Sequence, residues 1–232
     1  MNRLLLPLLF CGLALTINAQ ALTNGWGLEL SPMLADRRLV AADQIGFEEV
    51  RAIERQEKST TGFALGFFYR NRAEKIGTRW GVRYQQTGFD GNRREFPEEE
   101  MPEFPFTEIR YRAQIIEVPL WLDFYQNFGQ GSSFLFSFGL SLGVHFAQEY
   151  ETQPFDASLT PLDPIIAEDN YRGFNIAFMT GLGYETQLGS GLILGLQPQF
   201  QYWLLGNVVN DEANLNRNLY NVGLRVTLMR IN

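Results

Sequence analysis

FLFSFGLSLGVHF, residues 134–146, alternates large apolar side chains with small or polar ones at every position except Leu135. Strict alternation with a period of two is typical of a β-strand whose two faces meet different surroundings. The run is longer than the roughly 9–11 residues that a tilted strand needs to cross the hydrocarbon layer of a membrane. The stretch therefore predicts a membrane-crossing strand with one apolar face and one compact face.

Similar alternation recurs along the chain. The eight predicted strands are residues 26–34, 61–70, 76–89, about 108–125, 134–148, 174–186, 192–204 and 219–229. Long connections alternate with short ones throughout: the long ones are 36–60, 89–108, 149–172 and 206–217, and the short ones are 71–75, 126–132 and 187–191. This is the topology of an eight-stranded antiparallel transmembrane β-barrel with long extracellular loops and short periplasmic turns. Because lipid cannot pair an open sheet edge, we expect the first and last strands to pair.

Two local features are expected within this plan. Ile109, Tyr111 and Ala113 have the opposite parity to the apolar face that begins at Ile116. A bulge near Ile115, or the strand's emergence from the membrane, would explain this change. In the first long connection, residues 47–56 are expected to form a short extracellular helix.

Alternation alone also fits a soluble periplasmic lipocalin-like barrel, whose apolar face points inward. The less apolar face decides between the two, because it is rich in residues that fit a cramped interior. These residues are Gly77, Gly81, Ser137, Gly139, Ser141, Gly143, Gly181, Gly183, Gly195 and Gly223. The small face is therefore predicted to lie inside and the Phe-rich face to meet lipid, which places the chain in the outer membrane of a Gram-negative cell envelope.

The first nineteen residues have the pattern of a signal peptide. Arg3 precedes an apolar stretch from Leu4 to Ile17, and Ala19 provides a small residue for cleavage. We predict a signal peptide over 1–19 and a mature barrel over 20–232. The only cysteine, Cys11, lies in the signal peptide, so no disulfide is expected in the mature chain.

The formal net charge of −7 argues against a nucleic-acid partner, which would require a basic surface. We expect no cofactor and no metal site. The expected partners are outer-membrane lipid and lipopolysaccharide, the barrel-assembly machinery during insertion, and a secretion-system or envelope protein. The second long connection contains an acidic run, Glu98, Glu99 and Glu100, which could bind Ca²⁺ but has no EF-hand spacing, so solvation is the favoured interpretation.

Charged residues also fall on the face that is predicted to line the interior. They are Glu29, Arg79, Arg83, Glu117, Asp123, Glu185 and Arg225, with Arg70 as a further candidate. Isolated charges are costly in a narrow, poorly hydrated interior, so these residues are expected to form a structural ion-pair network. A narrow path for ions or protons is the alternative.

The only histidine, His145, shares its strand region with Ser137, Ser141 and Glu149, which suggests a hydrolase constellation. Ser141 is four residues from His145, roughly 13 Å along a strand, which is too far for a hydrogen bond. No Gly-x-Ser-x-Gly motif occurs either. We therefore expect a protein that is not an enzyme.

The segment AQIIEVPLWLDFY, residues 113–125, resembles a strand of the PorT-like outer-membrane β-barrel proteins of the Bacteroidetes, with residues 116–120 as the matching core. FSFGLSLG at 136–143 and GLGYE at 181–185 are also similar to that family. Two features depart from it: Asp123 replaces the usual Lys, and the chain ends in Arg230, Ile231 and Asn232 rather than in an aromatic residue. The resemblance implies fold and location, but it transfers no functional residues.

Four functions remain open at this point. The leading one is a non-enzymatic barrel with a side-chain-filled lumen that acts through extracellular loops or a partner in envelope integrity, adhesion or secretion-system association. The others are a narrow conduit or carrier of small hydrophobic ligands, an outer-membrane lipid-modifying enzyme, and the soluble lipocalin-like barrel.

Overall fold

The computed structural model describes residues 23–41, 46–95, 105–129, 131–167, 172–189, 191–206 and 215–231. The predicted signal peptide at 1–19 and the acidic run Glu98, Glu99 and Glu100 lie outside these residues. Among the described residues no helix is long and apolar enough to cross a membrane.

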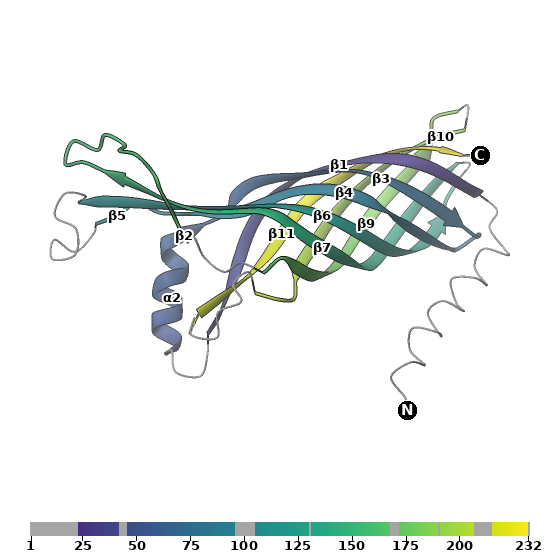
Figure 1. Ribbon diagram of the computed structural model, residues 1–232. Coiled ribbons are helices and arrows are strands. Elements are labelled where there is room, and N and C mark those ends of the chain that lie inside the picture. Colours follow the sequence, from purple (N-terminus) through teal and green to yellow (C-terminus); the bar gives the residue numbers. More distant parts are fainter. Residues whose placement is uncertain are drawn as a thin grey trace.

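Eight long strands form a closed antiparallel ring (Figure 1), which confirms the predicted fold class. In order around the ring they are β1 (Thr23–Ala41), β3 (Thr60–Arg72), β4 (Ile76–Gly91), β6 (Phe106–Asn127), β7 (Ser132–Phe155), β9 (Phe174–Gln187), β10 (Leu192–Trp203) and β11 (Leu215–Ile231). The ring closes where β1 pairs with β11, from Gly25 opposite Ile231 to Ala41 opposite Leu215. The predicted pairing of the first and last strands is therefore confirmed.

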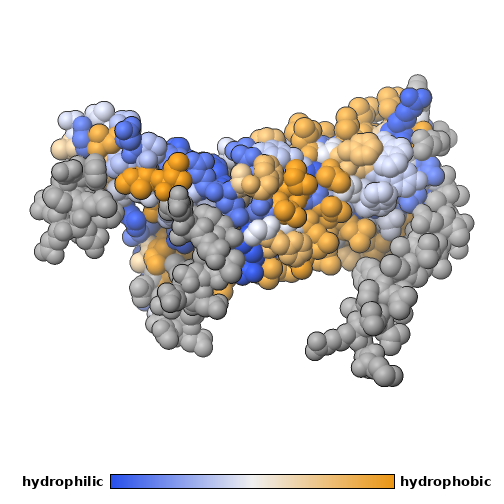
Figure 2. Space-filling view, in the orientation of Figure 1, coloured by the Kyte–Doolittle hydropathy of each residue, from blue (hydrophilic) through white to orange (hydrophobic). Residues whose placement is uncertain are grey.

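The two faces of each strand meet different surroundings. On β1, Leu28 is 60% exposed on the outside while its neighbour Glu29 is 3% exposed in the interior. Figure 2 shows a broad band of hydrophobic residues over the barrel body, with more polar residues toward both ends. An outward apolar band of this kind needs lipid around it, so the soluble lipocalin-like alternative is wrong.

Beyond the membrane the wall continues as an extracellular sheet, which projects to the left in Figure 1. β6 and β7 remain paired as far as Phe106 opposite Phe155. Short strands flank this extension: β2 (Glu57–Lys58) pairs with β4, β5 (Arg94–Glu95) with β6, and β8 (Ile165–Ala167) with β7. The helix expected at 47–56 is present as α2 (Phe47–Gln56).

At the base of this extension the residues that face the interior change from charged to apolar. Tyr111, Ala113 and Ile115 face inward with Glu117, and β6 keeps one parity throughout. Apolar residues face inward here because the outside of the wall now meets water. An irregularity is present as predicted near Ile115, but the extra residue belongs to β7, where His145 pairs with Ile115 and Ala147 with Gln114.

These inward residues form an apolar cluster above the membrane section of the barrel. Its buried members are Phe89, Tyr111, Ala113, Ile115, Ala177, Trp203 and Leu219. Gly143 makes room for the largest of them, because a Cβ atom at this position would lie 2.5 Å from Cη2 of Trp203. The absence of a side chain at Gly143 therefore sets the packing of the cluster.

Replacing Gly143 with Val should force Trp203 out of its position. Overpacking of this kind typically costs about 1–3 kcal/mol, so the folded barrel should unfold at a lower urea concentration in detergent. Leu142→Val, on the lipid-facing side of the same strand, is the control and should change the midpoint little. Equal midpoints for the two variants would contradict this account of the cluster.

Candidate functional site

The charged residues predicted for the lumen all lie inside the barrel. Four arginines and four carboxylates occupy its membrane section, and each of these eight residues is at most 4% exposed. The cations are Arg70, Arg79, Arg83 and Arg225, and the anions are Glu29, Glu117, Asp123 and Glu185. Equal numbers of opposite charges allow the interior to be neutral while remaining polar.

The centre of this network is the pair of Arg83 and Glu117, which face each other on β4 and β6. Nε of Arg83 lies 2.5 Å from Oε1 of Glu117. The other carboxylate oxygen accepts hydrogen bonds from the Ser141 hydroxyl at 2.5 Å and from the Gln201 amide at 2.9 Å. Three donors from three other strands thus surround one carboxylate that is fully shielded from solvent.

The periplasmic half of the barrel repeats this arrangement around Asp123. Nη2 of Arg79 donates to Oδ1 of Asp123 at 3.0 Å, and the Ser137 hydroxyl donates to the same oxygen. Closer to the periplasmic end, Nη1 of Arg70 donates to Oε2 of Glu185 at 2.6 Å. Each of these carboxylates is therefore bound by an arginine from another strand.

Arg225 is held differently from the other three arginines of the membrane section. Its Nη1 atom lies 4.0 Å from Oε2 of Glu29, at the limit of an ion pair. Its guanidinium group lies over the ring of Trp121, 4.2 Å from the centroid. A cation on an aromatic face is stabilised by the ring quadrupole, so Arg225 relies on a ring as well as on a distant carboxylate.

Uncharged residues extend the network toward the extracellular side, and sequence reasoning missed them. The Asn221 amide donates to Oε1 of Gln201 at 3.3 Å, and the Thr87 hydroxyl donates to Oδ1 of Asn221 at 2.7 Å. Thr87 and Asn221 share the parity of Arg83 and Arg225 on their own strands, and Gln201 shares the parity of the inward-facing Gly195 on β10. That shared parity is the signal that would have identified them.

A second charged cluster closes the extracellular side of the barrel. Glu57, at the start of β2, accepts hydrogen bonds from Arg37 and from Nη2 of Arg217, the latter at 2.7 Å. Both guanidinium groups lie over the ring of Phe89, at 5.6 and 5.5 Å from its centroid. We call Arg37, Glu57, Arg217 and Phe89 the Glu57 clamp. It was not predicted, because Glu57 lies in a long connection where its partners could not be inferred.

The residues considered for hydrolysis do not form a triad. The hydroxyls of Ser137 and Ser141 donate to Asp123 and Glu117, and the His145 ring packs edge-on against Trp203 with centroids 5.8 Å apart. Glu149 is exposed on β7 beyond the irregularity. Across the described ranges no group of His, Cys, Asp and Glu residues is arranged to hold a metal ion.

The closed ring, the lipid-facing band and the shielded charges together decide the class of protein. It is an outer-membrane β-barrel protein. The long connections mark the extracellular end, and the short turns mark the periplasmic end.

No protein-family model matches this chain, and no curated protein sequence matches it. Several solved structures share its outline at low identity. Neisserial surface protein A (NspA) is 11% identical, with 87% of this chain and 95% of that chain covered and a TM-score of 0.42. Ail, the attachment invasion locus protein of Yersinia pestis, is 11% identical over 88% and 97%, with a TM-score of 0.34. The translocator domain of the autotransporter NalP from Neisseria meningitidis is 8% identical over 90% and 87%, with a TM-score of 0.32. The fold assignment rests on the strand pairing within this chain.

Removing the Glu117 carboxylate should destabilise the barrel strongly. Glu117→Ala leaves the Arg83 guanidinium buried without its closest partner, which typically costs about 3–5 kcal/mol. Equilibrium unfolding in urea would measure this loss. Arg83→Met combined with Glu117→Leu removes both charges and should recover most of the stability.

Glu151→Ala is the matched control, because Glu151 pairs with the half-exposed Arg110 outside the membrane at 3.4 Å. An exposed pair of this kind contributes about 1 kcal/mol or less. If Glu117→Ala and Glu151→Ala shifted the unfolding midpoint equally, Glu117 would not be needed to neutralise the buried Arg83 guanidinium.

Disruption of the Glu57 clamp should loosen α2 without unfolding the barrel. Glu57→Ala removes the acceptor shared by Arg37 and Arg217, and hydrogen bonds to charged groups contribute roughly 1.5–3 kcal/mol. Limited proteolysis within α2 should therefore become about tenfold faster. Glu48→Ala, on the exposed side of α2, is the control and should leave the cleavage rate unchanged.

Proposed function

We propose that this protein is a non-enzymatic outer-membrane anchor whose lumen is filled, and that it acts through its extracellular sheet and loops or through a partner. Envelope integrity, adhesion and secretion-system association are the roles that fit such an anchor. The observation that carries the proposal is the change inside the barrel near Ile115, from paired charges in the membrane section to an apolar cluster above it. Both sections are occupied by packed side chains.

This filling disfavours a conduit. An eight-stranded barrel leaves an interior that side chains just fill. An ion crossing it would have to separate pairs such as Arg83 and Glu117 and then pass Trp203, which is fully buried in the apolar cluster. Desolvation makes both steps costly.

The extracellular sheet provides surface for a partner. Ile165 and Ile166 on β8 are 46% and 58% exposed although they lie outside the lipid-facing band. Successive side chains on a strand point to opposite faces, so β8 presents one exposed isoleucine on each face of the extracellular sheet. Exposed apolar side chains on a short strand at a sheet edge are typical of sites that pair with another chain. Asp156 and Asp163 lie nearby in the chain and give this region acidic character, which would favour a partner with basic residues.

The finer assignment is also a proposal. We infer that the chain is a PorT-like barrel of the Bacteroidetes type, on the support of the motif at 116–120, whose Glu117 binds Arg83 in the interior. Contacts with lipopolysaccharide, the barrel-assembly machinery, and a secretion-system or envelope protein belong to the same proposal.

Single-channel recording in planar bilayers tests the filled lumen. The wild-type protein should give no conductance steps. A variant that combines Glu117→Ala with Trp203→Ala opens both the network and the cluster, and it should give steps more often than the wild type. Stable, ohmic steps from the wild-type protein would overturn the proposal and favour the conduit.

Site-specific photo-crosslinking in intact cells tests the partner-binding role. A crosslinking residue at Ile166 should capture a discrete partner, while one at Leu188, which is similarly exposed at a periplasmic turn, is the control for position. Two outcomes would argue against an extracellular docking role. One is capture of the same protein from both positions, and the other is a failure to capture any protein from Ile166 and from every other extracellular position.

A further inference from the structure

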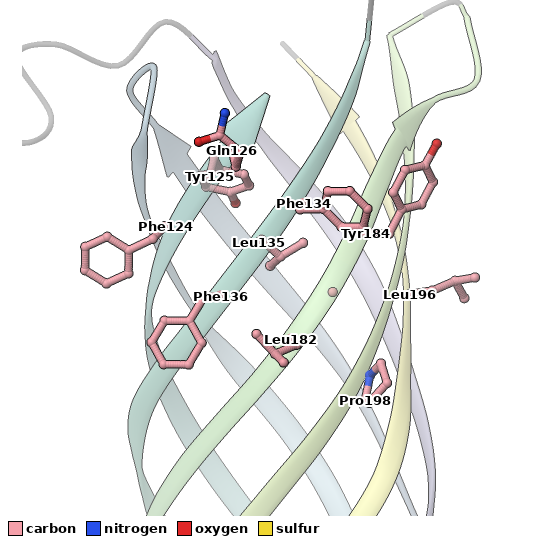
Figure 3. A pocket seen from close by; sticks show the side chains of 11 residues that line it. Phe124, Tyr125, Gln126, Phe134, Leu135, Phe136, Leu182, Tyr184, Leu196 and Pro198 are labelled. Carbon is pink, nitrogen blue, oxygen red and sulfur yellow. The ribbon is translucent and has the colours of Figure 1, made fainter. Parts of the chain in front are cut away.

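The outer wall of the barrel contains a hollow near its periplasmic end (Figure 3). Its volume is about 740 Å³, within the range of small-molecule binding sites, which is about 300–1,000 Å³. Phe134 and Phe136 on β7 form one side, Leu196 and Pro198 on β10 form the other, and Leu182 on β9 lies between them. These side chains give the hollow an apolar surface, which we call the β9 hollow.

The backbone explains why the wall is recessed here. The β9–β10 ladder is interrupted between the pair Leu196 and Tyr184 and the pair Gln199 and Gly181. Pro198 lies within this interval and has no N–H to donate. Gly183 in the same interval faces the interior, where a Cβ would lie only 3.0 Å from Cβ of Gln197, so the recess on the outside is attributed to the interrupted ladder at Pro198.

The periplasmic rim of the β9 hollow is polar. The Tyr184 hydroxyl lies 3.1 Å from the Ser132 hydroxyl, which in turn lies 3.3 Å from the Thr186 hydroxyl. Phe128 and Phe134 pack around the Tyr184 ring, with centroids 5.7 and 5.9 Å away. Aromatic rings with outward hydroxyls are typical of the level of lipid head groups. The hollow is therefore apolar along its length and polar where it reaches the membrane surface.

We propose that the β9 hollow binds one acyl chain of a phospholipid from the periplasmic leaflet, with the head group at the hydroxyls of Tyr184, Ser132 and Thr186. Two observations select this occupant. The hollow is continuous with the lipid-facing band, so acyl chains already surround it, and its polar rim lies at the periplasmic end. Lipopolysaccharide resides in the opposite leaflet and would approach from the other end of the strands.

Binding in a recess differs from ordinary contact with lipid. A chain seated in the hollow packs its methylene groups against side chains on three sides. Dispersion contacts and the hydrogen bonds at the rim supply the preference over bulk lipid. The site is independent of the extracellular role proposed above.

Native mass spectrometry of the detergent-solubilised protein with added phosphatidylethanolamine tests this site. The wild-type protein should retain one phospholipid at a collision energy that removes the others. Leu182→Trp fills the hollow and should lower the occupancy of the retained lipid about tenfold. Leu65→Trp, at a lipid-facing position on β3, is the control and should retain the lipid.

A second set of measurements distinguishes the contribution of the acyl chain to binding from that of the lipid head group. Lysophosphatidylethanolamine, which has one chain, should be retained as well as the two-chain lipid, whereas glycerophosphoethanolamine, which has none, should not. Tyr184→Phe should weaken retention while leaving the hollow open. If Leu182→Trp fails to fold, Leu196→Trp fills the hollow from the β10 side. Equal retention by the Leu65→Trp protein and both hollow-filling variants would overturn the proposal.

Discussion

Hydrocarbon offers no hydrogen-bond partner to a peptide group, and the rest of this structure depends on that constraint. A sheet in lipid must pair the backbone N–H and C=O groups of its own edge strands, so β1 has to pair with β11. Closure with eight strands then fixes a narrow interior. The narrow interior requires glycines and serines on the inward face, and the lipid requires phenylalanine and leucine on the outward face. Alternation along each strand is the direct consequence of these two demands.

The same narrowness explains why the interior charges are paired so closely. Water cannot fill the space around Glu117, so its oxygens are satisfied by Arg83, Ser141 and Gln201. Buried ion pairs of this kind contribute little to the net free energy of unfolding, because the cost of desolvating both charges offsets much of their attraction. It nevertheless fixes which strands face one another, since a shift in register would separate every arginine from its carboxylate. The packing of side chains inside the barrel is thus a consequence of closing a small barrel.

Above the membrane the wall is surrounded by water instead of lipid, and its interior residues change from charged to apolar while the sheet continues without a break. Trp203 and its neighbours form a conventional apolar core there, and the Glu57 clamp attaches α2 above that core. The wall is therefore one continuous sheet with two kinds of interior. Its apolar extracellular edge at β8 and its β9 hollow lie at opposite ends, so the proposed partner site and the proposed lipid site do not overlap.

Alternation and turn spacing determined from sequence alone the eight barrel strands, their inward face and the closure, because each depends on local period or on the demands of lipid. The helix α2 was also expected, whereas the short strands β2, β5 and β8 were not. The charged lumen residues were also identifiable, since parity assigns a side. Which arginine meets which carboxylate was decided only by tertiary structure, because pairing depends on register and side-chain reach across the barrel. The same holds for the Glu57 clamp, for the bulge on β7 rather than β6, and for the β9 hollow, all of which arise from contacts between strands and loops that no local pattern encodes.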